Sequence, residues 1–502
     1  MKHKYIFSLL LASLAIAGNS QAQNSSGKCW HIDYDQWNIN TPALHILCGN
    51  NPILNVGGEM TLEMWVCAYT FGENRKVFGK VGSDGSTFNN GYVIGYQNLN
   101  VYTEVWNPAT QTIPYASSGP IQLDSAFVHL STTYSISSGM LRDYVNGNLV
   151  GEVQVFPATP IVANDAQLVI GSAPWDSHAY QFYGTLDEVR IWNTAHTGNQ
   201  IKSLIHKELQ GNEPGLVAYY NFNTAHDSIV PDMSGNNNHG TLQNSQDNSW
   251  SWANSNAPVG DLQMYNLLEP TAAWSGKTGS EYNYAVTENG FSVIAEIGRK
   301  EFHKYILFAH TDANGVSVSN IPVDAPNGFK RSGREWYVTR SGHTVSDVFI
   351  NLTQTADGGE AFPSAQDASH YALLYRPNLT TNYIAIAYPN TVFADNLIFN
   401  DLILTSGYYA IGYSTEPTPL DVENVVRSQM KIYPNPASNV VIIENAENAH
   451  ITLMDASGRT LIQKRVVSDH QSINIETFCN GIYFVRIGHS DRSETIKLIV
   501  NQ

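Results

Sequence analysis

The stretch GTLDEVRIW, from Gly184 to Trp192, carries two adjacent carboxylates, a cation and a tryptophan among strand-forming residues. Successive side chains of a β-strand point to opposite faces of the sheet. Strict alternation predicts that Asp187 shares its face with Thr185, Val189 and Ile191. It predicts that Glu188 shares the other face with Leu186, Arg190 and Trp192. The two carboxylates then cannot act as a pair.

Catalysis is not indicated by this stretch or by the rest of the chain. Glycoside hydrolases place two carboxylates on either side of one sugar bond, and adjacent strand residues face away from each other. The sequence has no G-x-S-x-G nucleophile elbow, no H-E-x-x-H zinc motif and no phosphate-binding loop. We therefore predict a protein that is not an enzyme, with a divergent jelly-roll glycoside hydrolase or polysaccharide lyase as the alternative.

The two carboxylates pose different questions. Glu188 and Arg190 are expected to form an ion pair over the sheet surface. Asp187 would stand in an apolar row, where a carboxylate needs hydrogen-bond donors or a cation. Two interpretations stay open: a structural aspartate that ties a loop to the sandwich, and a Ca2+ ligand. Ca2+ needs several oxygens, which Asp232 and Asn236 in VPDMSGNNNHG could supply.

The first 22 residues, MKHKYIFSLLLASLAIAGNSQA, have the form of a secretory signal peptide. Two lysines precede an apolar run, and small residues close the segment. A membrane-spanning helix needs about 20 apolar residues, and no run in the chain reaches that length. The sequence predicts an exported protein without a transmembrane segment.

Composition narrows the class of protein and of partner. A chain of 502 residues is too long for one hydrophobic core. Its 14% charged and 11% aromatic residues are typical of exported β-sandwich proteins. A formal net charge of −17 argues against nucleic acid and anionic membranes as partners.

Cysteine is scarce, with four residues in the chain. Export permits disulfides, and Cys29 and Cys48 flank the expected first strand, so these two are the candidate pair. Cys67 and Cys479 are expected to be small buried hydrophobic residues.

Short strands separated by Asn, Gly and Ser turns fill the chain from Cys29 to Leu242. The pair Asn146-Gly147 between two apolar runs predicts a tight hairpin, because a type I′ turn needs positive φ twice. One helical turn is predicted in GNQIKSLIHKEL, where apolar residues recur at helical spacing.

Four motifs of this region follow one another in a recognisable order: MTLEMWV, VHLSTTYSISSGMLRDYVNGNLVGEV, LVIGSAPWDSHAYQFYGTLDEVRIWN and GLVAYYNFNTAHDSIVPDMSGNNNHGTL. As a set they resemble the laminin-G-like, concanavalin-like jelly-roll domains of exported bacterial proteins. The resemblance implies two antiparallel sheets packed face to face. It also implies a domain that binds glycans or proteins, in some cases with Ca2+.

A second ordered set closes the chain: IYPNPASNVVII, ITLMDASGRTL, INIETFCNGIYFVRI and ETIKLIV. This set resembles the type A C-terminal sorting domain of the type IX (Por) secretion system. The resemblance implies a small immunoglobulin-like β-sandwich that the outer-membrane export machinery recognises. It places the protein outside the cell or on the outer cell surface.

The expected protein is therefore all-β, with a jelly-roll sandwich, a middle β-sandwich of unknown role and a small sorting domain. The expected boundaries are a signal peptide at 1–22, a laminin-G-like domain at 23–245, a linker at 246–260, a middle domain at 261–415, a linker at 416–429 and a sorting domain at 430–502.

Aromatic residues of the jelly roll are the candidates for ligand contact. The loop APWDSHAY combines rings with polar groups, and aromatic faces stack on the apolar faces of sugars. The proposed contacts are Trp106, Trp175, Asp176, His178 and Tyr180. We predict a non-catalytic protein that binds a glycan or an extracellular protein, and a purely structural surface or matrix protein remains a further alternative.

Overall fold

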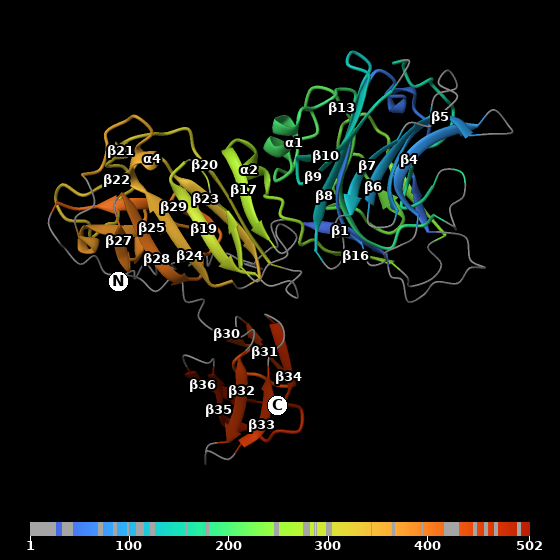
Figure 1. Ribbon diagram of the computed structural model, residues 1–502. Helices are drawn as coiled ribbons and strands as arrows, with labels where there is room; N and C mark the ends of the chain where they lie inside the picture. The colour runs from blue at the N-terminus through green and yellow to red at the C-terminus, as the bar shows by residue number, and fades with distance from the viewer. Residues whose placement is uncertain are drawn as a thin grey trace, which may run out of the picture.

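The computed structural model describes residues 27–501 apart from short gaps. The gaps are 33–43, 69–73, 84–87, 98–99, 107–114, 121–125, 156–157, 174, 176–179, 245–249, 275–281, 286, 288, 298–303, 343, 364–366, 394, 416–430, 445–448, 456–459, 466–469 and 489–492. The described chain is almost entirely β and forms three sandwiches (Figure 1). None of its described helices is long and apolar enough to cross a membrane.

The N-terminal sandwich consists of two eight-stranded sheets, here called sheet 1 and sheet 2. Sheet 1 contains, in spatial order, β10 (Asn148–Gln154), β9 (Met140–Val145), β8 (Val128–Ser135), β3 (Glu59–Ala68), β12 (Gly184–Trp192), β1 (Lys28–Ile32) and β16 (Trp250–Asn254), with β13 (Leu216–Tyr220) also paired to β12. Sheet 2 contains β14 (Ile229–Val230), β15 (Gly240–Gln243), β2 (His45–Leu47), β11 (Val169–Ile170), β4 (Arg75–Ser83), β5 (Phe88–Gln97), β6 (Asn100–Trp106) and β7 (Tyr115–Pro120).

Alternation explains how the two sheets close one core. Every second residue of β3, such as Leu62 and Met64, faces sheet 2, which contributes residues such as Tyr92 and Ile94. The intervening residues of β3, including Glu63 and Trp65, lie on the outer face of sheet 1. This sandwich confirms the predicted jelly-roll architecture.

The predicted hairpin turn and the predicted helical turn are both present in the backbone. The hairpin between β9 and β10 turns at Asn146 and Gly147, both with positive φ (50° and 71°), as predicted. The predicted helical turn forms α1 (Gly198–Leu204), whose N-cap Thr197 and Gln200 make a capping box. A short helix η1 (Pro52–Leu54) follows β2.

Three expectations are corrected. Cys479 is exposed rather than buried. The stretch assigned to a linker contains β16, because Trp250 and Trp252 alternate with small residues and pack against the sandwich core. Cys29 and Cys48 are buried free thiols rather than a disulfide. Cys29 lies on β1 of sheet 1, and Cys48 directly follows β2 of sheet 2, so the two cysteines belong to different sheets.

The middle sandwich also consists of two sheets. Sheet 3 contains β17 (Leu268–Trp274), β20 (Tyr305–His310), β23 (Trp336–Ser341), β29 (Gly407–Tyr413), β22 (Lys330–Ser332), β21 (Val316–Ser317), β25 (Tyr371–Arg376) and β26 (Ile384–Ala387). Sheet 4 contains β18 (Tyr282–Ala285), β19 (Phe291–Glu296), β24 (Ser346–Asn351), β28 (Asn396–Leu402) and β27 (Thr391–Phe393). The helices are α2 (Leu262–Tyr265), α4 (Leu352–Ala356) and η2 (Ala368–His370).

The C-terminal sandwich has a separate core. Its strands are β30 (Lys431–Tyr433), β31 (Val440–Glu444) and β34 (His470–Asn474) in one sheet, and β33 (Thr460–Arg465), β32 (His450–Asp455), β35 (Gly481–Gly488) and β36 (Ser493–Val500) in the other. The core contains Val441, Ile451 and Val485.

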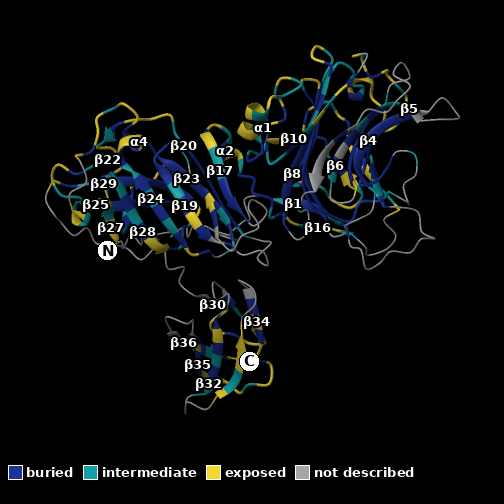
Figure 2. Ribbon diagram, viewed as in Figure 1, coloured by how far each residue is buried: buried dark blue, intermediate teal, exposed yellow. Residues whose placement is uncertain are grey.

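The N-terminal and middle sandwiches each have a core of their own, and they share a further hydrophobic cluster between them. Figure 1 shows α1 and α2 between them. Trp65 of β3 lies with its ring 5.8 Å from Trp274 of β17, and Trp274 donates its indole N–H to the carbonyl of Phe127 at 3.0 Å. Both indoles are buried, as is the surrounding cluster (Figure 2). Sheet 1 is therefore covered on both faces.

Replacing Trp274 with Ala should destabilise both sandwiches together, because it empties their shared cluster. A buried Trp→Ala change costs about 3–5 kcal/mol. Calorimetry of the wild type should show one transition for the two sandwiches, which moves to lower temperature in Trp274→Ala. The control Phe393→Ala removes a ring that is 72% exposed and should leave that transition in place. Two separate wild-type transitions, one of them unmoved by Trp274→Ala, would contradict the shared cluster.

Candidate functional site

The stretch GTLDEVRIW forms β12, and a β-bulge interrupts its alternation. Asp187 is opposite Trp65 and Arg190 is opposite Glu63, so two residues of β12 face a single residue of β3 between them. Glu188 takes up the extra position with a positive φ of 53°, a conformation that is uncommon for residues other than Gly.

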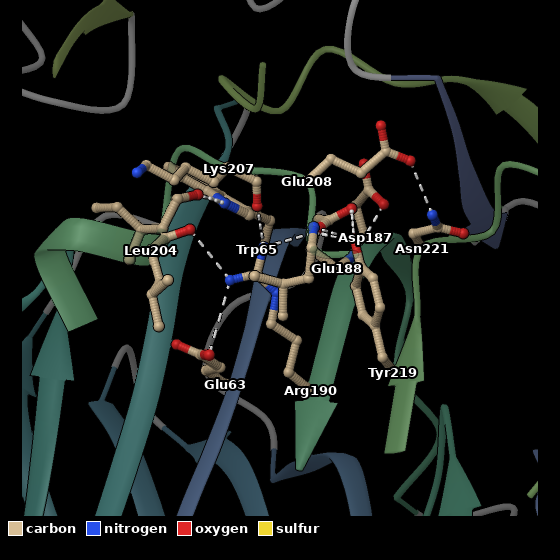
Figure 3. A network of polar contacts seen from close by, with 12 residues as sticks. Glu63, Trp65, Asp187, Glu188, Arg190, Leu204, Lys207, Glu208, Tyr219 and Asn221 are labelled. Atoms are coloured by element: carbon tan, nitrogen blue, oxygen red, sulfur yellow. Dashed lines mark hydrogen bonds and ion pairs between the residues drawn. The ribbon is translucent and has the colours of Figure 1, made fainter. Parts of the chain in front are cut away.

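The bulge corrects the predicted assignment of faces. The core-facing residues are Leu186, Val189 and Ile191, while Asp187, Arg190 and Trp192 lie outside that core. Glu188 also points to the outer side, where it pairs with Arg190 (Figure 3). The predicted Glu188–Arg190 ion pair therefore exists, but both side chains are buried rather than on the surface.

Arg190 is the centre of the network in Figure 3. Its guanidinium lies 2.5 Å from a carboxylate oxygen of Glu188 and 3.7 Å from Glu63. It also donates to the backbone carbonyls of Leu204 and Lys207, at the end of α1 and just beyond. One cation thus pairs with two buried carboxylates and binds two backbone carbonyls, of which that of Leu204 also accepts the backbone N–H of Lys207.

The surroundings keep Glu63 ionised. Burial raises the pKa of its carboxyl, but the His129 ring, 3.4 Å away, and the charge of Arg190 outweigh burial and lower the pKa to about 2. The indole N–H of Trp192 donates to Glu63 at 2.7 Å, and the Tyr219 hydroxyl donates to Glu188. These buried charges are compensated, as buried charges must be.

Asp187, Asp232 and Asn236 make hydrogen bonds to protein groups. Asp187 accepts from the backbone N–H of Glu188 and from the hydroxyl of Ser255, a residue directly after β16. Asp232 accepts from three backbone N–H groups, one of them in β13, and Asn236 donates to carbonyls of β13. These bonds fit the interpretation of Asp187 as a structural aspartate that ties a segment to the sheet. In the described part of the chain, no three His, Cys, Asp or Glu side chains gather as a metal site.

Glu208 belongs to the same region and was not singled out from the sequence. It accepts from the side-chain amides of Asn221 and Asn223. Burial and the charge of Glu188 raise the pKa of its carboxyl to about 7. No motif marks this residue, because its neighbours are brought together by the path of the chain after α1.

A different group of side chains gathers on the outer face of sheet 2. The ring of Trp175 lies 5.6 Å from that of Trp106 and 5.7 Å from that of Tyr180. The backbone N–H of Lys76 on β4 donates to the carbonyl of Tyr180, which holds the loop against the sheet. Three of the predicted contact residues are thus brought together from β6 and from one loop, and all three are half-buried.

An ion pair lies beside these rings. The ammonium of Lys76 on β4 is 3.2 Å from Glu104 on β6, across the intervening strand β5. On β5, Lys76 is in register with Gly95, which has no side chain, whereas Glu104 is in register with Val93, so the two paired residues are offset along the strands. A Cβ at Gly95 would meet the Arg75 carbonyl oxygen at 2.3 Å. Burial lowers the pKa of Lys76, and the charge of Glu104 partly offsets this.

The aromatic site is defined here as Trp106, Trp175, Tyr180, Lys76 and Glu104. Lys76 is also 5.9 Å from the Trp175 ring centre and 6.0 Å from that of Tyr180. The remaining predicted contacts, Asp176 and His178, lie outside the described residues. Lys76 and Glu104 were missed from the sequence, since the register that joins β4 to β6 is not visible there.

Replacing Arg190 with Ala should strongly destabilise the N-terminal sandwich, because Glu188 and Glu63 lose their buried cation. Breaking a buried pair in this way costs about 3–5 kcal/mol. The control Arg142→Ala breaks an ion pair with Glu152 that is partly exposed, and its cost is about 0–1 kcal/mol. Urea unfolding at pH 7 measures both. Equal losses of unfolding free energy in the two variants would show that the buried Arg190 network stabilises the sandwich no more than the partly exposed pair does.

Family models match two parts of the chain. Residues 44–202 match the concanavalin A-like lectin/glucanases superfamily, and residues 431–501 match the secretion system C-terminal sorting domain. Both matches confirm the resemblances seen in the sequence.

Two curated relatives are agarases of Zobellia galactanivorans. Beta-agarase D is 21% identical over 239 residues, which is 47% of this chain and 46% of that protein. Beta-agarase A is 32% identical over 84 residues, 16% of this chain and 15% of that protein. The chain thus spans less than half the length of these relatives.

Solved structures include similar chains at low overall similarity. A putative carbohydrate binding protein from Bacteroides ovatus is 17% identical, with a TM-score of 0.34 over 46% of this chain and 60% of that one. A heptameric SAP-like pentraxin from Limulus polyphemus is 15% identical, with a TM-score of 0.29 over 36% of this chain and 82% of that one.

The family matches agree with the folds of the first and third sandwiches and with the signal-peptide pattern. The chain is an exported protein, secreted or on the cell surface, that carries a concanavalin A-like lectin/glucanase domain and a secretion-system C-terminal sorting domain.

Proposed function

We propose that the protein is a non-catalytic glycan-binding protein and that the aromatic site on sheet 2 holds the glycan. The observation that carries this proposal is the gathering of Trp106, Trp175 and Tyr180 beside the partly exposed Glu104. Residues 430–502 would deliver it through the type IX machinery, and an extracellular protein remains the alternative ligand.

The chemistry of the site suits a sugar. A sugar ring has an apolar face of C–H groups and an edge of hydroxyls. Indole and phenol rings offer apolar surface to the C–H face of the sugar. The carboxylate of Glu104, held by the Lys76 ammonium and the Trp106 indole N–H, offers acceptors to the hydroxyl groups of the sugar.

Hydrolysis is the second candidate, favoured by the likeness to two agarases. Retaining and inverting glycosidases commonly use two carboxylates that flank the sugar bond. The eight strands of sheet 2 contain a single carboxylate, Glu104. This supports binding without a two-carboxylate reaction on these strands.

Trp175→Ala should weaken glycan binding, since it removes one of the stacking rings. Burying such a side chain contributes about 1.5–3 kcal/mol, or roughly a 10- to 100-fold change in Kd. A glycan array that includes agarose oligosaccharides, followed by calorimetric titration of the glycans that bind, measures the loss.

The matched control is Tyr284→Ala, which removes a half-exposed ring on sheet 4 and should bind as the wild type does. Equal binding by wild type and Trp175→Ala would refute the location of the site. Release of new reducing ends from the bound glycan would favour hydrolysis over binding alone.

A further inference from the structure

Among the described residues of the aromatic site, one charged group reaches solvent, and that group is negative. Glu104 keeps 19% of its side chain exposed, whereas the side chain of its partner Lys76 is 1% exposed. The lysine therefore lies beneath the site. A ligand that approaches the rings meets the carboxylate first.

Glu104 is also held in place with acceptor capacity left over. One carboxylate oxygen faces the Lys76 ammonium at 3.2 Å, and the other accepts the Trp106 indole N–H at 3.1 Å. An ionised carboxylate has about four acceptor positions, so the described residues leave about two for the hydroxyl groups of a ligand. Hydrogen bonds from hydroxyls to a carboxylate are of the strong, charge-assisted kind.

The charge of Lys76 is already matched within the protein. Its ammonium pairs with Glu104 and lies near the rings of Trp175 and Tyr180, so it offers no uncompensated positive charge to an anion. The formal net charge of the chain is −17, which repels polyanions at long range. The pair is neutral as a whole, and its exposed end, the Glu104 carboxylate, has the same sign as the net charge of the chain.

We propose that the site takes an uncharged glycan and that Glu104 discriminates against sulfated or carboxylated sugars. This proposal rests on the proposed function, since it assigns a ligand class to the same site. For a neutral sugar, Glu104 accepts hydroxyl hydrogen bonds. A sulfate or carboxylate group in the same position would face another anion across a short distance.

The sign of the effect of Glu104→Gln tests the proposal. A neutral amide accepts a weaker hydrogen bond than a carboxylate does, so the Kd for a neutral glycan should rise about fivefold. For an anionic glycan, removal of the negative charge should instead lower the Kd. The probes are agarose oligosaccharides and their O-sulfated derivatives, measured by calorimetric titration.

The matched control is Glu152→Gln, the same chemical change on β10 of sheet 1, which should leave both affinities unchanged. A wild-type measurement that needs no variant accompanies it: the Kd for a neutral glycan should vary less than about twofold from low to high salt, because screening acts on charge pairs.

The outcomes separate the two proposals. Preference for the unsulfated oligosaccharides, with weaker binding by Glu104→Gln, supports the uncharged ligand class. Preference for the sulfated oligosaccharides, with salt-sensitive binding that Glu104→Gln strengthens, overturns it and leaves glycan binding intact. Absence of binding to any neutral or anionic glycan on a broad array overturns the proposed function itself.

Discussion

The pairing of Arg190 with two buried carboxylates is the interaction on which the rest of the structure depends. Glu188 and Glu63 lie on the outer face of sheet 1, where burial without a cation would be costly. The same guanidinium binds carbonyls of Leu204 and Lys207, so the segment after α1 is held over the sheet. This cover, together with Trp274 of the middle sandwich, turns an outer face into an interior.

The two sheets of the N-terminal sandwich consequently have different roles. Sheet 1 docks the middle sandwich, and the charges of Glu63, Glu188 and Arg190 are compensated inside the protein. Sheet 2 places its ion pair at the edge of solvent, with Lys76 below and Glu104 above among three rings. Each sheet thus has a cation paired with a carboxylate beside aromatic side chains. On sheet 1 this pairing stabilises the buried face, and on sheet 2 it forms part of the candidate ligand site.

Features that depend on local residue spacing could be predicted from the sequence, whereas features that depend on contacts between strands could not. The hairpin at Asn146-Gly147 and the helix α1 depend on local spacing and were predicted correctly. The bulge at Glu188 was not, since Glu, unlike Asn before Gly, gives no local signal of a positive φ. Its omission misplaced Asp187, whereas the ion pair was expected at the surface because the sequence does not reveal what covers sheet 1. The partnership of Lys76 with Glu104 depends on register between strands, which one sequence does not reveal.

Ligand is expected to bind the outer face of sheet 2 and to leave sheet 1 untouched. Hydrogen exchange of the full chain, with and without a saturating glycan found on the array, tests this directly. Slower exchange is expected in β4, β6 and around Trp175 and Tyr180, with no change in β8 and β9 of sheet 1. Ligand-dependent protection of β8 and β9, or of the middle sandwich, without protection of β4 and β6 would contradict the claim.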